Sequence, residues 1–335
     1  MKVSIDSVHE TEKAGRSVDL KREAKRIIGN YTQGKEGPLL IVTGAIHGNE
    51  PAGVKALQVV LTQLKDWEIP IEGQIIGLIG NLQAFSKSQR YISKDLNRQW
   101  KPENVLRVKR TPKEKLKEED AEQKELIEFF ERTLNEEKFQ SDRRVVLLDL
   151  HTTSADGVAY SIVTSIGGSR KIAESLGVPT IMGFDKAILG TTLNYFSDLG
   201  LESFCFEAGQ HDAESSVTRT ISAIWQVLVG LGCIEAREIP FFNNHKGLLH
   251  ELGEDLPRTV QYKYRHVIVP EDCFKMLLGF DNFQYVEKGQ LLAHDKDGKI
   301  RAPFSGVMLM PLYQAQGKDG FFIVEEISKL IVDNE

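Results

Sequence analysis

The sequence predicts an α/β fold, in which helices cover both faces of a central sheet, followed by a smaller C-terminal domain rich in β-structure. Nearly continuous apolar runs alternate with segments whose apolar residues recur at helical spacing. Such alternation is typical of a sheet packed between layers of helices. After about Arg237 the pattern changes to short β-rich runs separated by Gly and Pro, which indicates a second unit.

The first elements follow from apolar periodicity. Residues 26–31 predict a strand, and residues 38–44 predict a central strand, because they are apolar on both faces. Pro51 suits the first residue of a helix, and residues 52–66 then carry apolar groups at helical spacing. Residues 75–80 predict another buried strand.

The middle of the chain begins with a basic stretch. Residues 101–117 are rich in Lys and Arg and contain two prolines, so we interpret them as a solvated loop. Residues 118–135 predict a charged amphipathic helix. Three further elements are predicted: a strand over 144–150 that ends at His151, a short strand over 204–206 that ends at Glu207, and a helix over 216–231.

The chain therefore divides, by prediction, into a catalytic domain over residues 1–238 and a β-rich domain over residues 239–335. The C-terminal part offers only short β-rich runs, and no long helix is evident there.

Composition narrows the class of protein. The formal net charge is -6, which argues against a nucleic-acid-binding protein that works through a basic field. The polar N-terminus has no apolar signal core, and no apolar run is long enough to span a membrane. Three scattered cysteines without CxxC spacing fit a reducing compartment, so we expect a cytoplasmic protein.

Two strand ends carry residues that suit a metal ion. His47 and Glu50 follow the strand over 38–44, and His151 follows the strand over 144–150. Imidazole and carboxylate suit zinc, and two histidines with one carboxylate leave a coordination position open for water. Because open α/β sheets bind ligands beyond the carboxyl ends of their strands, we expect one catalytic metal site there. Asp149 is either an orienting partner of an imidazole or an ordinary hydrogen-bond acceptor.

Other residues suit substrate binding and proton transfer. Arg98, with Asn97 beside it, could clamp a carboxylate, and Arg90 could polarise a carbonyl, although a surface charge cluster is the alternative. Glu207 follows an apolar strand, so it could be a half-buried general base, or a strand-end Glu in an ordinary ion pair. His211 stays ambiguous between a functional and a loop histidine.

Four stretches in order, GAIHGNE, RYISKDLNR, LDLHTT and FEAGQ, resemble the succinylglutamate desuccinylase/aspartoacylase family. The resemblance covers roughly residues 38–240 and implies the zinc carboxypeptidase fold with its mixed central sheet. It also implies a role for each motif residue: His47, Glu50 and His151 as ligands of one Zn²⁺ per chain, Arg90 as the carbonyl-polarising arginine, Asn97 and Arg98 as the carboxylate grip, and Glu207 as general acid/base.

The implied reaction is hydrolysis of a small N-acyl amino acid. This substrate is the only binding partner that we expect, apart from possible further copies of the same chain. A carboxypeptidase that acts on peptides, and a catalytically silent metal-binding module, are the alternatives. The aspartoacylase branch places an extra arginine shortly before the catalytic Glu to bind a side-chain carboxylate. Residues 171–218 contain no Arg here, only Lys171 and Lys186 as cations, so the sequence leaves acidic specificity open.

Overall fold

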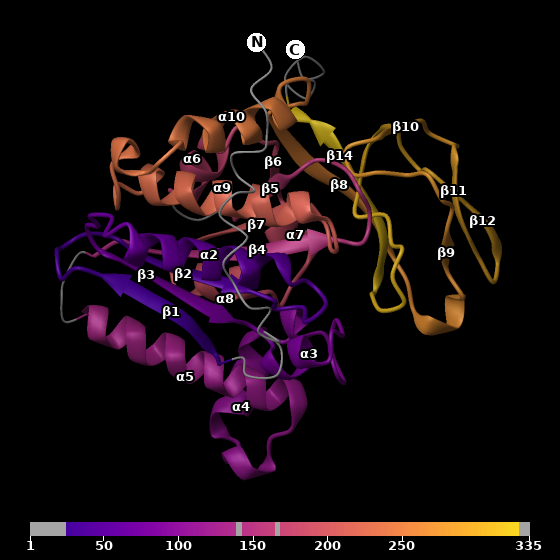
Figure 1. Cartoon of the computed structure of the whole chain (residues 1–335). Coiled ribbons are helices and arrows are strands. Elements are labelled where there is room, and N and C mark those ends of the chain that lie inside the picture. The colour runs from indigo at the N-terminus through magenta and orange to yellow at the C-terminus, as the bar shows by residue number, and fades with distance from the viewer. Residues whose placement is uncertain (1–24, 139–142, 165–167, 328–335) are drawn as a thin grey trace.

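The protein folds around one large mixed sheet that runs through most of the molecule, as seen in a computed structural model (Figure 1). The structure describes residues 25–138, 143–164 and 168–327. Within them an 11-stranded sheet has the order β1-β3-β2-β4-β7-β5-β6-β8-β14-β13-β10, and a 3-stranded sheet has the order β12-β11-β9. The predicted α/β class with a mixed central sheet is confirmed.

The first half of the sheet carries the strands that the apolar runs predict. Strands β2, β3, β4 and β7 run parallel to one another, whereas β1 is antiparallel to β3 and β5 is antiparallel to β7. Their bounds are β1 Ile27–Thr32, β2 Leu39–Gly44, β3 Gln74–Ile79, β4 Val145–Thr153, β5 Tyr160–Val163, β6 Thr180–Met182 and β7 Glu202–Gln210.

Helices cover both faces of this sheet, as Figure 1 shows. Alternate residues of β2 divide between two cores: Leu40 and Val42 pack with α2 and α9, whereas Leu39 and Ile41 pack on the side of α5 and α8. The helices are α2 Ala52–Asp66, α3 Leu82–Ser86, α4 Pro102–Arg110, α5 Glu118–Lys138, α6 Ser169–Ser175, α7 Phe184–Ala187, α8 Thr192–Asp198, α9 Glu214–Gly230 and α10 Phe242–Gly253.

Two helices differ from the sequence-based expectation. Part of the stretch 101–117, interpreted as a loop, forms α4, which starts at Pro102 and buries Val105 and Val108. Its other residues are mostly charged and solvated, so the composition of the segment favoured a loop over a helix. Helix α10 occupies the region in which no long helix was evident.

The C-terminal part is joined to the large sheet. Strand β8 pairs with β6 of the first half, and β14 pairs with β8, so the sheet continues across the predicted boundary at residues 238/239. The strands here are β8 Thr259–Val267, β9 Lys275–Met276, β10 Tyr285–Val286, β11 Leu291–Asp295, β12 Gly298–Arg301, β13 Gly306–Leu309 and β14 Asp319–Glu326. In the described part of the chain, none of the helices is long and apolar enough to cross a membrane.

Candidate active site

Three side chains that could hold a metal ion meet where two parallel strands end. His47 and Glu50 lie in the turn between β2 and α2, and His151 lies near the end of β4. Strands β2 and β4 pair in parallel, with Gly44 opposite Leu150, so both chain segments leave the sheet at the same edge. The turn is tight, since Ala45 has a φ of 54°. The topology thus brings together residues about a hundred positions apart.

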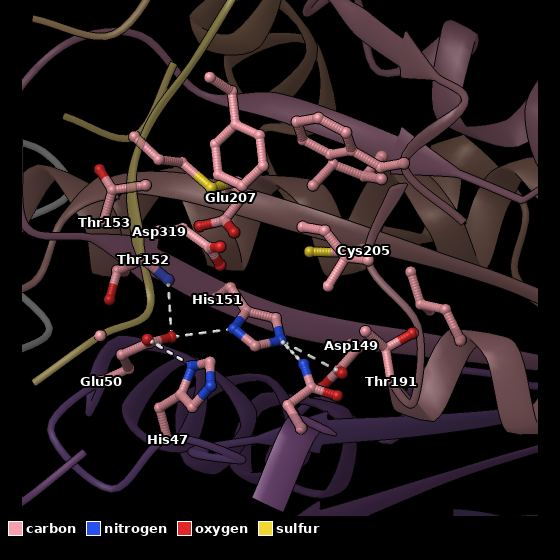
Figure 2. A pocket seen from close by; sticks show the side chains of 18 of the residues that line it. His47, Glu50, Asp149, His151, Thr152, Thr153, Thr191, Cys205, Glu207 and Asp319 are labelled. Carbon is pink, nitrogen blue, oxygen red and sulfur yellow. Dashed lines mark hydrogen bonds and ion pairs between the residues drawn. The ribbon is translucent and has the colours of Figure 1, made fainter. Parts of the chain in front are cut away.

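The geometry of these three side chains suits a metal ion. His47, Glu50 and His151 are all buried and offer ligand atoms that lie within 4.8 Å of one another. Figure 2 shows the Glu50 carboxylate facing both imidazoles, with a dashed line to each. Nδ1 of His47 lies 2.8 Å from Oε1 of Glu50, and Nδ1 of His151 lies 3.0 Å from Oε2. Two imidazoles and one carboxylate are a donor set that zinc accepts in catalytic sites.

A carboxylate lies behind each imidazole. Nε2 of His47 is 3.1 Å from Oδ1 of Asp95, and Nε2 of His151 is 3.2 Å from Oδ2 of Asp149. Asp149 also accepts hydrogen bonds from the hydroxyls of Thr43 and Thr192, so it is both an orienting partner and a hydrogen-bond acceptor. Carboxylate–histidine pairs of this kind fix the ring and leave the other nitrogen for a metal.

Charge balance explains the protonation of this cluster. Burial alone would raise the pKa of Glu50, but the two neighbouring imidazoles hold it well below its usual range. Burial opposes protonation of His151, yet the carboxylates of Asp149 and Glu50 hold its pKa well above the usual value. Glu50 is therefore ionised at neutral pH and available as a ligand.

Glu207 lies opposite His151 on the adjacent strand. Strand β7 pairs with β4 in parallel, and His151 and Glu207 are partners in the register. Glu207 is 6% exposed, and its Oε2 atom is buried without a hydrogen-bond partner in the protein. Burial, opposed by His151 and assisted by Glu50, raises the pKa of Glu207 to about 8. Such a carboxyl can exchange a proton near neutral pH.

Arg90 contacts the cluster from the side. Its Nη2 lies 3.2 Å from Asp95 and 2.9 Å from Nε2 of His47, and its Nη1 lies 3.5 Å from Glu50. Burial acts against the charge of Arg90, but Asp95 and Glu50 more than offset it and raise its pKa. Glu119 accepts hydrogen bonds from the backbone of residues 92–94 and so holds the loop that carries Arg90.

Asn97 and Arg98 lie in a 3₁₀ turn, Leu96–Arg98, in which the N–H of Asn97 donates to the side chain of Asp95. Asn97 is fixed by the N–H of Thr192, which donates to its side-chain oxygen at 2.9 Å. Arg98 donates to Asp319 at 3.0 Å, and Arg265 donates to the other oxygen of Asp319 at 2.6 Å. The clamp predicted from sequence is therefore already paired with a carboxylate of β14.

The predicted site residues all line the same cavity. His47, Glu50, Arg90, Asn97, Arg98, His151 and Glu207 all line it. No sequence motif pointed to Gln314 and Asp319, which also line the cavity from the C-terminal part of the chain. Gln314 accepts hydrogen bonds from Asn49 and from His211, whose Nδ1 faces Thr152. No local motif could reveal contacts across such sequence separations.

Several basic and aromatic residues of the described chain do not line the cavity. Arg170 forms an exposed ion pair with Glu174 on α6. The hydroxyl of Tyr313 donates to backbone oxygens of Leu277 and Phe280, within the C-terminal part. Lys186 and Tyr285 do not belong to the described residues that line the cavity, and Tyr285 is 58% exposed.

Known proteins resemble this chain over most of its length. The chain is 27% identical over 281 residues to the succinylglutamate desuccinylase of Shewanella pealeana, covering 78% of this chain and 74% of that protein. It is 22% identical over 288 residues to the succinylglutamate desuccinylase of Pseudoalteromonas atlantica, covering 81% and 76% of the two chains.

Solved structures share the fold. The succinylglutamate desuccinylase/aspartoacylase from Rhodobacter sphaeroides matches with a TM-score of 0.61 at 16% identity, covering 87% of this chain and 86% of that chain. The product-bound ectoine utilization protein EutE (DoeB) from Ruegeria pomeroyi matches with a TM-score of 0.60 at 18% identity and the same coverage of 87% and 86%.

The family model for the succinylglutamate desuccinylase/aspartoacylase catalytic domain matches residues 36–228. This range is more than half of the chain and contains all the candidate ligands and catalytic groups described above. The chain therefore belongs to the succinylglutamate desuccinylase/aspartoacylase family of deacylases.

Proposed function

We propose that the protein is a zinc-dependent deacylase that hydrolyses the amide bond of a small N-acyl amino acid. The observation that carries this proposal is the meeting of His47, Glu50 and His151 in one buried place, each imidazole backed by a carboxylate. These residues would hold one Zn²⁺ per chain. A zinc ion so held supplies Lewis-acid chemistry, lowering the pKa of a bound water toward about 7.

Glu207 is the group that moves the proton. Its unpaired Oε2 and its pKa of about 8 suit a carboxyl that takes a proton from water and gives it to the leaving amine. The pairing of Glu207 with His151 across two strands keeps this carboxyl beside the ligand cluster. A plain structural ion pair would leave neither a buried unpaired oxygen nor a raised pKa.

Arg90 and Arg98 handle the negative charges of the substrate. Arg90, buried against the ligand cluster, stabilises the charge that develops on the carbonyl oxygen in the transition state. Asn97 and Arg98 bind the carboxylate of the amino acid, and Arg98 presents its planar guanidinium in the cavity.

A peptide substrate is less favoured by the shape of the site. Met310, Leu312, Gln314, Gly317 and Lys318 line the cavity from the segment that precedes β14. Gln314 ties this segment to Asn49 and His211, both next to the ligand turns. A mouth covered in this way suits a small molecule. The retention of Glu207 and Arg90 disfavours a silent metal-binding module, which would need neither.

The test is metal content together with activity. Purified protein should carry about one zinc per chain, lose hydrolysis of N-acyl amino acids after chelation, and regain it with added zinc. His151→Asn should lose both zinc and activity, because it removes a ligand. His245→Asn is the matched control, since His245 contacts Ser222 in the helical layer outside the cavity and should leave both unchanged. A fully active protein without metal would refute the proposal.

A further inference from the structure

The lining of the cavity contains both polar and apolar side chains. The polar part includes the ligand cluster, Glu207 and Arg90. The apolar part consists of buried side chains that belong to one hydrophobic core, and it is called the side chamber below. Its members are Ile162, Phe184, Ile188, Leu193, Cys205 and Phe322.

Several elements of the fold build the side chamber. Ile162 of β5 and Cys205 of β7 are partners in the sheet register. Leu193 comes from α8, Phe184 from α7 and Phe322 from β14. Phe322 is 1% exposed and packs against Phe184, with ring centroids 4.9 Å apart. Burial raises the pKa of the Cys205 thiol well above its usual value, so this residue adds no charge at neutral pH.

The cluster of charged groups around Arg98 has a net charge of one positive unit. Arg98 and Arg265 share the single carboxylate of Asp319, at 3.0 Å and 2.6 Å. Two guanidinium groups and one carboxylate leave a net charge of +1. Arg265 is also fixed by the carbonyl oxygen of Ala187, so this cluster is held in place. One substrate carboxylate neutralises it, and a second would find no remaining charge.

The other charges of the cavity do not supply a partner for a second carboxylate. Arg90 is engaged by Asp95 and Glu50 on the catalytic side. Lys318 is exposed, and it is the remaining lysine or arginine among the described residues of the lining. Asp185 also lines the cavity and is a carboxylate, which repels an anion.

We propose that the side chamber takes an uncharged hydrocarbon group, so that the preferred substrate is an N-acyl amino acid with a single carboxylate. This inference rests on the proposed deacylase function and adds the class of substrate. The hydrocarbon group comes either from the amino acid or from the acyl chain, and both sources present the same chemistry to Ile162, Leu193 and Phe322. A buried second carboxylate would lack a cation and lose its hydration.

The test compares matched substrates on the zinc-loaded protein. One arm varies the amino acid: N-acetyl-L-leucine, N-acetyl-L-glutamate and N-acetyl-L-lysine. The other arm varies the acyl group: N-hexanoylglycine and N-succinylglycine. In at least one arm the apolar member should exceed the charged members by about 100-fold or more in kcat/KM, since several methylene groups are buried and each contributes. That arm identifies the source of the group.

A substitution checks the charge count. Asp319→Asn is nearly isosteric and raises the net charge of the Arg98 cluster from +1 to +2. It should raise the ratio of kcat/KM for the dicarboxylate over the apolar substrate about tenfold or more. Asp272→Asn is the matched control, because Asp272 pairs with Lys296 outside the cavity.

Failure of this inference differs from failure of the deacylase function. A preferred substrate with a second carboxylate or an ammonium group in both arms would overturn the inference and leave the deacylase function intact. Absence of hydrolysis with every compound would overturn the proposed function. Thermal shifts of the zinc-loaded protein with leucine and hexanoate against glutamate and succinate would then still decide the side chamber, because tighter ligands shift the melting temperature further. Larger shifts with the dicarboxylates would overturn the inference.

Discussion

Replacing Glu207 with Gln separates the catalytic role of this side chain from its effect on folding. Glu207 is 6% exposed, and burial raises its pKa from 4.5 to about 8. In the unfolded chain the carboxyl ionises above pH 4.5, whereas in the folded metal-free protein it stays protonated to about pH 8. The free energy of unfolding therefore falls as the pH rises through this window and levels off above it.

The size of the effect follows from the same pKa. Each pH step of one inside the window weakens the folded state by up to about 1.4 kcal/mol. Between pH 5 and 7 the wild-type protein should thus lose roughly 3 kcal/mol relative to Glu207→Gln, whose amide does not titrate. In the zinc-loaded enzyme the same substitution should lower kcat by about 10² to 10⁴, the usual contribution of general acid–base catalysis.

The assay combines urea denaturation of the metal-free proteins at several pH values with kinetics and zinc analysis of the loaded proteins. The zinc content of Glu207→Gln should equal that of the wild type. Glu287→Gln is the control, because Glu287 is exposed and does not line the cavity. If the stabilities of wild type and Glu207→Gln change in parallel with pH, or if the variant stays fully active, the assigned role of Glu207 is wrong.

Three further substitutions probe the cluster and the core. Asp149→Asn removes the carboxylate behind His151 and should lower zinc affinity by about 10- to 100-fold in a chelator competition; equal affinity would deny Asp149 an orienting role. Arg90→Ala should lower kcat by about 10² to 10³ with zinc retained, and a change in KM alone would assign Arg90 to binding. Phe130→Ala, at a position that is 0% exposed on α5, should destabilise the protein by about 3 to 5 kcal/mol in urea, and a loss under 1 kcal/mol would show that the core there collapses without a cavity.

Strands and helices with a strong apolar pattern were predictable along most of the chain. Strand β4 is buried at every position and begins with the apolar run over residues 145–148, so it needs no tertiary information to be found. Helix α4 was hidden because only Val105 and Val108 of its nine residues are buried, and the charged remainder resembles a loop. Helix α10 was hidden because little of it is buried, chiefly Leu249 and Gly253.

The candidate site also has one part that the sequence predicts and another that only the tertiary structure reveals. His47, Glu50 and His151 could be proposed from sequence because each follows an apolar run, and the ends of parallel strands meet at one edge of a sheet. The residue types then restrict the chemistry to a cation such as zinc. The residues next to each candidate ligand in the sequence were therefore sufficient to predict these three ligands.

The surroundings of the site were decided by tertiary structure alone. Asp319 meets Arg98, and Gln314 meets Asn49, across more than two hundred residues, whereas Gln314 and His211 are about one hundred residues apart. Such contacts depend on where β14 pairs in the sheet, and the apolar periodicity of the sequence does not predict strand order. The sequence by itself therefore determined the fold class and the kind of chemistry, because burial and ligand type are local properties. Only the folded chain decided which charges are already paired beside the substrate, because pairing depends on distance in space.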